Sequence, residues 1–163
     1  MQTQLDNLKA RAANSRRENI QYFKKLKKQK PRQLDQVMQA LHEEAFDKTD
    51  CMQCANCCKT TSPLFLQKDI ERLATYLKIS PGQFIRQYLH MDEDGDFVFN
   101  EAPCPFLAAD NYCMVYDHRP NACREYPHTD RRKFHQVLDI TLKNTAICPA
   151  VYDIVERLKT IIP

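Results

Sequence analysis

The fold is decided by the stretch Cys51-Met52-Gln53-Cys54-Ala55-Asn56-Cys57-Cys58, which places four cysteines within eight residues. Four more cysteines follow, at Cys104, Cys113, Cys123 and Cys148. Thiolates separated by two residues can point to the same side of a turn and converge on one metal centre. The pattern therefore predicts that all eight cysteines are metal ligands, and that the fold is organised around them.

Composition restricts the setting in which these thiols act. The chain has 163 residues and is 43% hydrophobic, enough for one ordinary globular domain. It has no run of about 18 apolar residues, so we expect no transmembrane segment. The first residues contain neither an apolar stretch nor a small-residue cleavage site, which predicts a cytoplasmic protein with reduced thiols. In an exported protein the same eight cysteines would instead predict disulfides.

The spacing of the cysteines leaves the metal open. Cys51, Cys54 and Cys57 repeat every three residues, as in the first three ligands of a ferredoxin-like run. The adjacent Cys57 and Cys58 suit two centres, or one ligand and one supporting thiol. Zinc sites usually combine two close pairs, whereas an iron–sulfur cluster accepts a compact triplet and one remote cysteine. We expect an iron–sulfur cluster or Zn²⁺, with the spacing favouring iron–sulfur, in one or two four-thiolate sites.

The remaining charged and potentially catalytic residues do not indicate a second site. A surplus of thiolate charge can be offset by the neighbouring Lys59, His118, Arg119 and Arg124. For His118, His128 and His135 a solvated side chain is expected rather than a ligand. No carboxylate pair or Ser/His/Asp constellation stands out, so catalytic residues stay unknown. The two glycines, Gly82 and Gly95, are too few for a phosphate-binding loop.

Apolar periodicity predicts a mainly α fold with a small β hairpin, built as an irregular metal-organised cysteine-cluster domain. Helices are expected over 1–30, 32–46, 69–78, 81–90 and 150–160, with Ser80-Pro81 as a strong helix start. A turn and a short helix are expected over 117–126, and residues 134–143 mix helix and strand signals. A strand is expected over 96–99 and a hairpin over 106–116.

A basic arm precedes a mildly acidic body. Residues 1–32 hold ten Lys or Arg and two acids, a surplus of +8, so the remainder carries −5 of the net charge of +3. We divide the chain into a basic helical arm, 1–47, and a cysteine-cluster metal-binding domain, 48–163. The stretch from Tyr22 to Arg32 could contact nucleic-acid phosphates or an anionic surface, and aromatics beside lysines favour nucleic acid. A solvated helix with extended lysines is the simpler interpretation.

The chain resembles the YkgJ-like CxxCxxCC cysteine-cluster family, described as a putative zinc- or iron-chelating domain. The resemblance extends from about Cys51 to Cys148. It rests on three motifs besides the cysteine run: Cys104-Pro105-Phe106-Leu107, Tyr112-Cys113-Met114-Val115-Tyr116, and Arg119-Pro120-x-x-Cys123-Arg124-x-Tyr126-Pro127. It implies that the eight cysteines are the metal ligands, and that Arg119 and Arg124 pair with acids or with the cluster. A longer relative, flagellin lysine N-methylase, carries a similar motif, but no methyl-donor site is recognisable here.

Two functions are consistent with this sequence. The first is a metal-binding protein that holds zinc or an iron–sulfur cluster through clustered cysteines, with an undefined biochemical role. The second is a redox or transferase enzyme that uses an iron–sulfur cluster. Whether the chain is an enzyme, and which partner it has, are not decided by the residues.

Overall fold

The structure is a computed structural model that describes residues 2–163, apart from the side chains at positions 2–4 and 6. The chain forms two compact units. One combines residues up to Cys51 with Pro127–Pro163, and the other consists of Met52–Tyr126. Each unit has a hydrophobic core of its own.

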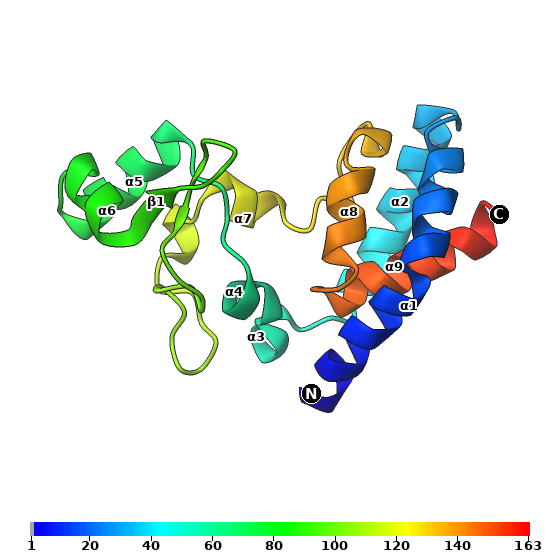
Figure 1. Cartoon of the computed structure of the whole chain (residues 1–163), viewed down its shortest axis with the longest axis horizontal. Coiled ribbons are helices and arrows are strands. Elements are labelled where there is room, and N and C mark those ends of the chain that lie inside the picture. Colours follow the sequence, from blue (N-terminus) through cyan, green and yellow to red (C-terminus); the bar gives the residue numbers. More distant parts are fainter. Residues whose placement is uncertain (1) are drawn as a thin grey trace. The chain divides into compact units, whose positions relative to one another are not determined.

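The first unit is a helical bundle (Figure 1). Its helices are α1 (Gln2–Leu26), α2 (Pro31–Phe46), the 3₁₀ turn η2 (Phe134–Gln136), α8 (Leu138–Asn144) and α9 (Pro149–Ile161). Pro31 and Pro149 open α2 and α9, where the missing N–H of proline costs no helical hydrogen bond. The carboxyl-terminal α9 contacts both α1 and α2, and α8 contacts α1, so both ends of the sequence build this unit.

Its core comes from the apolar faces of these helices. Side chains from α1, α2, η2, α8 and α9 pack together with almost no exposure; the largest are Leu26, Leu34, Met38, Phe134, Leu138, Ile154 and Leu158. Asp35 joins two elements of the unit by accepting the backbone N–H groups of Lys133 (2.7 Å) and Phe134 (2.9 Å). This carboxylate therefore fixes the start of η2 against α2.

The second unit combines short helices with one small sheet. It contains most of α3 (Cys51–Cys54), then α4 (Asn56–Thr60), α5 (Gln67–Leu77), α6 (Pro81–Tyr88), the 3₁₀ turn η1 (Tyr116–His118) and α7 (Asn121–Glu125). Strands β1 (Leu89–Met91) and β2 (Phe97–Phe99) pair antiparallel, with Leu89 opposite Phe99. The core is aromatic, and Phe65, Phe84, Phe99 and Phe106 are all buried. It supports the irregular chain that carries most of the cysteines.

Most of the expected elements are confirmed. The fold is mainly α with one small antiparallel hairpin. Ser80 caps α6 as predicted, since its hydroxyl accepts the Gln83 N–H while the Gln83 side chain accepts the Ser80 N–H. Residues 134–143, which the pattern left undecided, form η2 and the greater part of α8. The division at residues 47 and 48 stays a prediction.

Two local predictions were wrong. The helix expected over 81–90 ends at Tyr88, because Leu89–Met91 turns into a strand that pairs with β2. The hairpin of the fold therefore lies over 89–99, around a turn in which Gly95 has a positive φ of 85°. The segment 106–116 forms only a single antiparallel bridge, between Leu107 and Cys113.

Within residues 2–163, no helix has the length and apolar character needed to cross a membrane.

The first unit offers a test of its packing at Tyr22. This side chain is 8% exposed, its hydroxyl donates to the Ile162 carbonyl at 2.7 Å, and burial raises the pKa of Tyr22 to about 12. Tyr22→Phe should lower the free energy of unfolding by about 1 kcal/mol at neutral pH, because Ile162 loses its donor. Chemical denaturation monitored by circular dichroism measures this loss.

The same residue predicts a difference at high pH. Because the folded state raises the pKa, ionisation of Tyr22 favours unfolding, so its stabilising contribution is complete below pH 10 and falls as the pH rises toward 12. The stability gap between wild type and Tyr22→Phe should therefore narrow over this range. A gap that stays constant from pH 7 to pH 12 would contradict the assigned burial.

Candidate metal centre

The compact cysteine run forms two short helices joined by one strained residue. Helix α3 begins at Cys51 and ends at Cys54, so these two residues occupy neighbouring positions of one helical face. Ala55 has a positive φ of 45° and starts α4, which contains Cys57 and Cys58. The Sγ atoms of Cys57 and Cys58 lie 4.0 Å apart. Cys51 is exposed, whereas the other three are partly buried.

Two backbone contacts bring later cysteines toward this run. The N–H of Cys104 donates to the Cys58 carbonyl at 2.8 Å, which ties the chain before Phe106 to α4. Cys113 forms the antiparallel bridge with Leu107, and the Met114 N–H donates to the Phe106 carbonyl at 2.9 Å. Phe106 is itself 6% exposed in the aromatic core. The core thus holds the segments of Cys104 and Cys113 against each other.

Four thiols of this unit lie close enough to interact electrostatically. Burial, together with the charges of Cys58, Cys104 and Cys113, raises the pKa of Cys123 to about 12. Burial likewise raises the pKa of Cys104 to about 11, with contributions from Cys58 and Cys113. For Cys113 burial is again the main cause of the raised pKa, and Cys58 adds to it. Cys58, Cys104, Cys113 and Cys123, which we call the thiol cluster, therefore occupy one neighbourhood.

Positive charge and hydrogen bonding offset part of this repulsion. The hydrogen bond with Cys57 lowers the pKa of Cys58 to about 7, and Lys59 acts in the same direction against the effect of burial. The Arg119 guanidinium offsets part of the rise in the pKa of Cys113 and Cys123. Cys58 is thus the member of the thiol cluster that most readily forms a thiolate, the species that binds metals.

The thiol donors of the cluster are of the type that bind thiophilic metal ions. Four thiols with two basic neighbours match the four-thiolate sites that hold zinc or iron–sulfur clusters. Among residues 2–163, however, no three His, Cys, Asp or Glu side chains are already arranged so that they could hold a metal ion. The backbone therefore brings the segments of these thiols together, while their side chains do not yet form a complete coordination site.

The other sequence candidates lie elsewhere or in different roles. Cys148 precedes α9 in the first unit, where its N–H donates to Asn144 and its side chain packs on the core. His118 stacks on Tyr76 with ring centroids 4.2 Å apart. His128 and His135 belong to the first unit, and all three histidines are partly buried, so the expectation of solvated rings stays a prediction.

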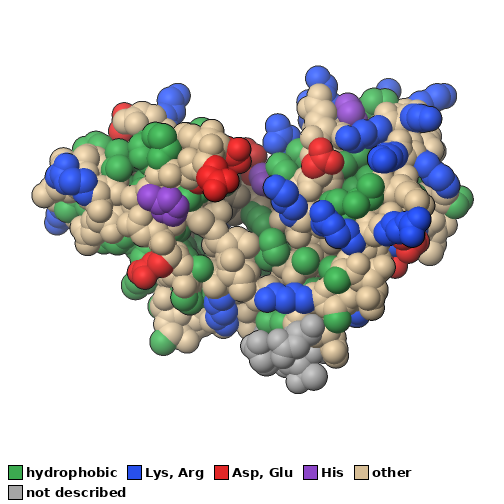
Figure 2. Space-filling view, viewed as in Figure 1, with side chains coloured by type: hydrophobic (Ala, Val, Ile, Leu, Met, Phe, Trp, Pro, Cys, Tyr) green, Lys and Arg blue, Asp and Glu red, His purple; other side chains and the backbone are tan. Residues whose placement is uncertain are grey.

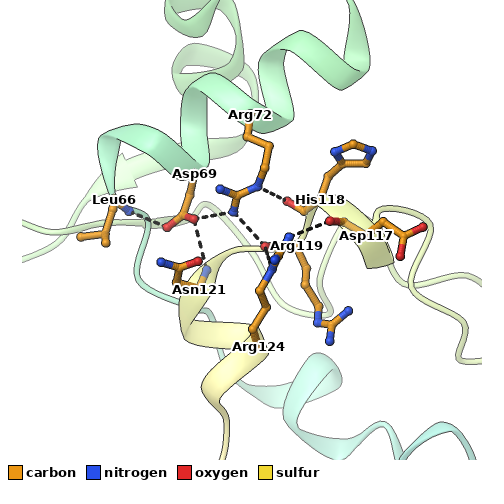
Figure 3. Close-up of polar contacts among 8 residues, drawn as sticks. All are labelled: Leu66, Asp69, Arg72, Asp117, His118, Arg119, Asn121 and Arg124. Atoms are coloured by element: carbon orange, nitrogen blue, oxygen red, sulfur yellow. Dashed lines mark hydrogen bonds and ion pairs between the residues drawn. The ribbon is translucent and has the colours of Figure 1, made fainter.

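Asp69 and Arg72 on α5 are polar residues near the thiol cluster that the sequence did not single out (Figure 3). Asp69 is 1% exposed and accepts from Arg72 Nη2 (2.6 Å), the Asn121 N–H (3.1 Å) and the Leu66 N–H (3.1 Å). Three donors satisfy this buried carboxylate, and removing them would cost about 3 kcal/mol. An acid on the buried face of an amphipathic helix was the available signal.

Arg119 and Arg124 support the loop that connects Cys113 to Cys123. Arg124 donates from Nε to the Arg119 carbonyl (3.2 Å) and from Nη2 to the Asp117 carbonyl (2.6 Å). Arg119 lies over the Tyr116 ring, 3.7 Å from its centroid, and donates to the Tyr116 carbonyl. The hydrogen bonds described for both side chains go to backbone carbonyls of the loop between Cys113 and Cys123. Arg119 also acts electrostatically on Cys113 and Cys123, in agreement with the expected pairing with the cluster.

Comparison with known proteins gives one match. A family model named CxxCxxCC, described as a putative zinc- or iron-chelating domain, matches residues 50–148, which is more than half of the chain. No curated protein and no solved structure matches the chain.

Proposed function

Because the chain belongs to the CxxCxxCC family of putative zinc- or iron-chelating domains, we propose that it is a metal-binding protein whose centre is built on the thiol cluster. The observation that carries this proposal is the set of backbone contacts that bring the segments of Cys58, Cys104 and Cys113 together, and the raised pKa of Cys123 agrees with its lying beside them. These residues come from three separate segments, α4, the 104–113 loop and α7. At neutral pH the raised pKa values keep Cys104 and Cys123 protonated, and a bound cation would displace these protons and compensate the charge of the resulting thiolates.

The remaining cysteines stay candidate ligands. Cys51 and Cys54 lie one turn apart on α3, and Cys57 touches Cys58, so this run can complete the first centre or contribute to a second one. Cys148 is retained from the sequence as the eighth candidate. An iron–sulfur cluster would supply electron transfer, whereas zinc would supply structural cross-linking. The cysteine spacing supports iron–sulfur, and a thiol-only donor set accommodates both.

A structural contribution of the metal follows from the local architecture. From Asn100 to Tyr126 the second unit has only two short helical turns and one isolated β-bridge. Such irregular chain gains little from regular backbone hydrogen bonding, so metal binding and local folding are expected to be coupled. The alternative of a redox or transferase enzyme, and the cytoplasmic location, stay predictions.

Serine substitutions test the ligand assignment. Cys104→Ser and Cys123→Ser, in protein purified anaerobically, should each lose most of the bound metal, because a four-thiolate site with three ligands binds far more weakly. Elemental analysis measures the metal per chain. Met114→Leu, at an exposed position of the same loop, is the matched control and should keep the full amount.

The same measurement can reject the proposal. If Cys104→Ser and Cys123→Ser both retain metal at the stoichiometry of the wild-type protein, the thiol cluster is not the centre. If the wild type purifies without metal and takes up neither zinc nor iron after reduction, the metal-binding function itself fails.

The first unit supports a second proposal, that it binds nucleic-acid phosphates. Its residues include 17 Lys or Arg and 11 Asp or Glu, whereas the second unit has 7 and 10. On the face shown in Figure 2, Lys and Arg side chains dominate the part of the molecule that contains α1, α2 and α8. An open groove of about 940 Å³ lies in this unit and is lined by Arg32, Arg132 and Lys133 beside Asp35.

Burial of the apolar face of α1 favours phosphates over a membrane. Leu8, Ala12, Phe23 and Leu26 are at most 5% exposed, so α1 has no free apolar face to insert into lipid. Burial also removes the expected contribution of the aromatic side chains to nucleic-acid binding. Tyr22 and Phe23 are both buried and cannot stack on bases, so binding would rest on charge alone.

The proposal predicts strong salt dependence through the groove. Replacing Arg32, Arg132 and Lys133 together by Gln should weaken binding to a labelled DNA duplex and lower the log–log salt slope by about 0.9 per lost phosphate contact. The control triple variant, Lys68→Gln, Lys78→Gln and Arg86→Gln, removes the same charge from exposed positions of the second unit. Equal slopes for the two variants, or retention on phosphatidylserine vesicles only, would refute the nucleic-acid proposal.

A further inference from the structure

We propose that Asp69 and Arg72 are positioning residues for the thiol cluster, because they hold the segment between Cys113 and Cys123 in the conformation that presents both thiols to a metal. This inference rests on the proposed metal-binding function. It extends that function to residues of α5, a helix that contains no cysteine.

Asp69 fixes the start of the helix that carries Cys123. Its Oδ1 accepts the N–H of Asn121, the first residue of α7, at 3.1 Å, while Oδ2 accepts the N–H of Leu66 at 3.1 Å. Cys123 follows two residues later, and its own N–H donates to the Pro120 carbonyl at 3.0 Å. One carboxylate therefore ties the first turn of α5 to the first turn of α7 (Figure 3).

Arg72 fixes the chain that leads from Cys113 to α7. Its Nε donates to the His118 carbonyl at 3.2 Å and its Nη2 to the Arg119 carbonyl at 2.9 Å. The carbonyls of Tyr116 and Asp117 accept from the Arg119 and Arg124 guanidinium groups. Four consecutive carbonyls thus receive arginine donors, and only Arg72 anchors this loop to a different element.

The anchor itself is rigid. On α5, Ile70, Leu73 and Ala74 are at most 1% exposed and pack in the aromatic core with Phe84. The helix also receives the capping contact between Asp69 and Leu66 at its first turn. Because α5 cannot shift without disturbing this core, Asp69 and Arg72 hold the loop in a defined position relative to the core.

Stability alone is a poor explanation for this arrangement. A buried ion pair often stabilises a fold no better than apolar residues of the same volume, since desolvation of both charges offsets their attraction. What it does provide is directional hydrogen bonding to specific backbone groups. Here those groups belong to the loop that connects two thiols, and partners that orient metal ligands typically change metal affinity about 10- to 100-fold when removed.

The test compares Asp69→Asn and Arg72→Lys with two controls in the full chain. Asp69→Asn keeps the shape but loses the charge, and Arg72→Lys keeps the charge but cannot reach two carbonyls at once. Glu71→Gln removes an exposed carboxylate of α5. Leu73→Val destabilises the same helix from its apolar side. For each reduced protein, Co²⁺ affinity is measured by competition with a chelator, and the free energy of unfolding by denaturation.

We expect Asp69→Asn and Arg72→Lys to weaken Co²⁺ binding about 10-fold or more, with faster hydrogen exchange at the Asn121 amide in the Asp69 variant. Glu71→Gln should bind Co²⁺ with wild-type affinity. Leu73→Val should bind Co²⁺ more tightly than an Asp69 or Arg72 variant with the same free energy of unfolding. If Asp69→Asn does not fold, Arg72→Lys decides the question.

Unchanged affinity in both folded variants, or a loss no larger than that of Leu73→Val, overturns the positioning role while leaving the metal centre intact. Failure of the wild-type chain to bind Co²⁺ overturns this inference and the proposed function together.

Discussion

The central constraint on this structure is the high cost of ionising thiols that are partly buried and gathered from distant segments. Cys58, Cys104, Cys113 and Cys123 share one neighbourhood, and each negative charge there makes the next more costly. Arg119 and Lys59 offset part of that cost. Without a cation Cys104 and Cys123 stay protonated near neutral pH, whereas a bound divalent or cluster cation would stabilise the thiolates and tie their segments together.

The surrounding fold keeps those sulfurs close without regular secondary structure. An aromatic core around Phe84 and Phe106 holds the loop of Cys104 and Cys113, while polar contacts from α5 hold the start of α7. Apolar packing therefore determines where the segments lie, and directed hydrogen bonds determine the conformation of the loop. In the other unit, residues from both ends of the sequence share one core, and most of the basic side chains belong to it.

The sequence predicted features that depend on local patterns better than features that depend on tertiary contacts. Helices with an apolar stripe or a cap, such as the one that Ser80 starts, were found because periodicity and capping are local. The end of α6 was missed because pairing of Leu89 with Phe99 is a tertiary contact. Asp69 was missed for a related reason. Its position on the apolar face of α5 was a local signal, but its role depends on Asn121, which lies 52 residues away in the sequence.

X-ray absorption spectroscopy of the metal in anaerobically purified protein tests the central claim most directly, because it reports which atoms surround the cation. The account predicts a first coordination shell made of sulfur at about 2.3 Å, either from four thiolates on zinc or from thiolates and sulfide on iron. A shell dominated by nitrogen or oxygen would contradict it, since the cysteines could not then be the ligands.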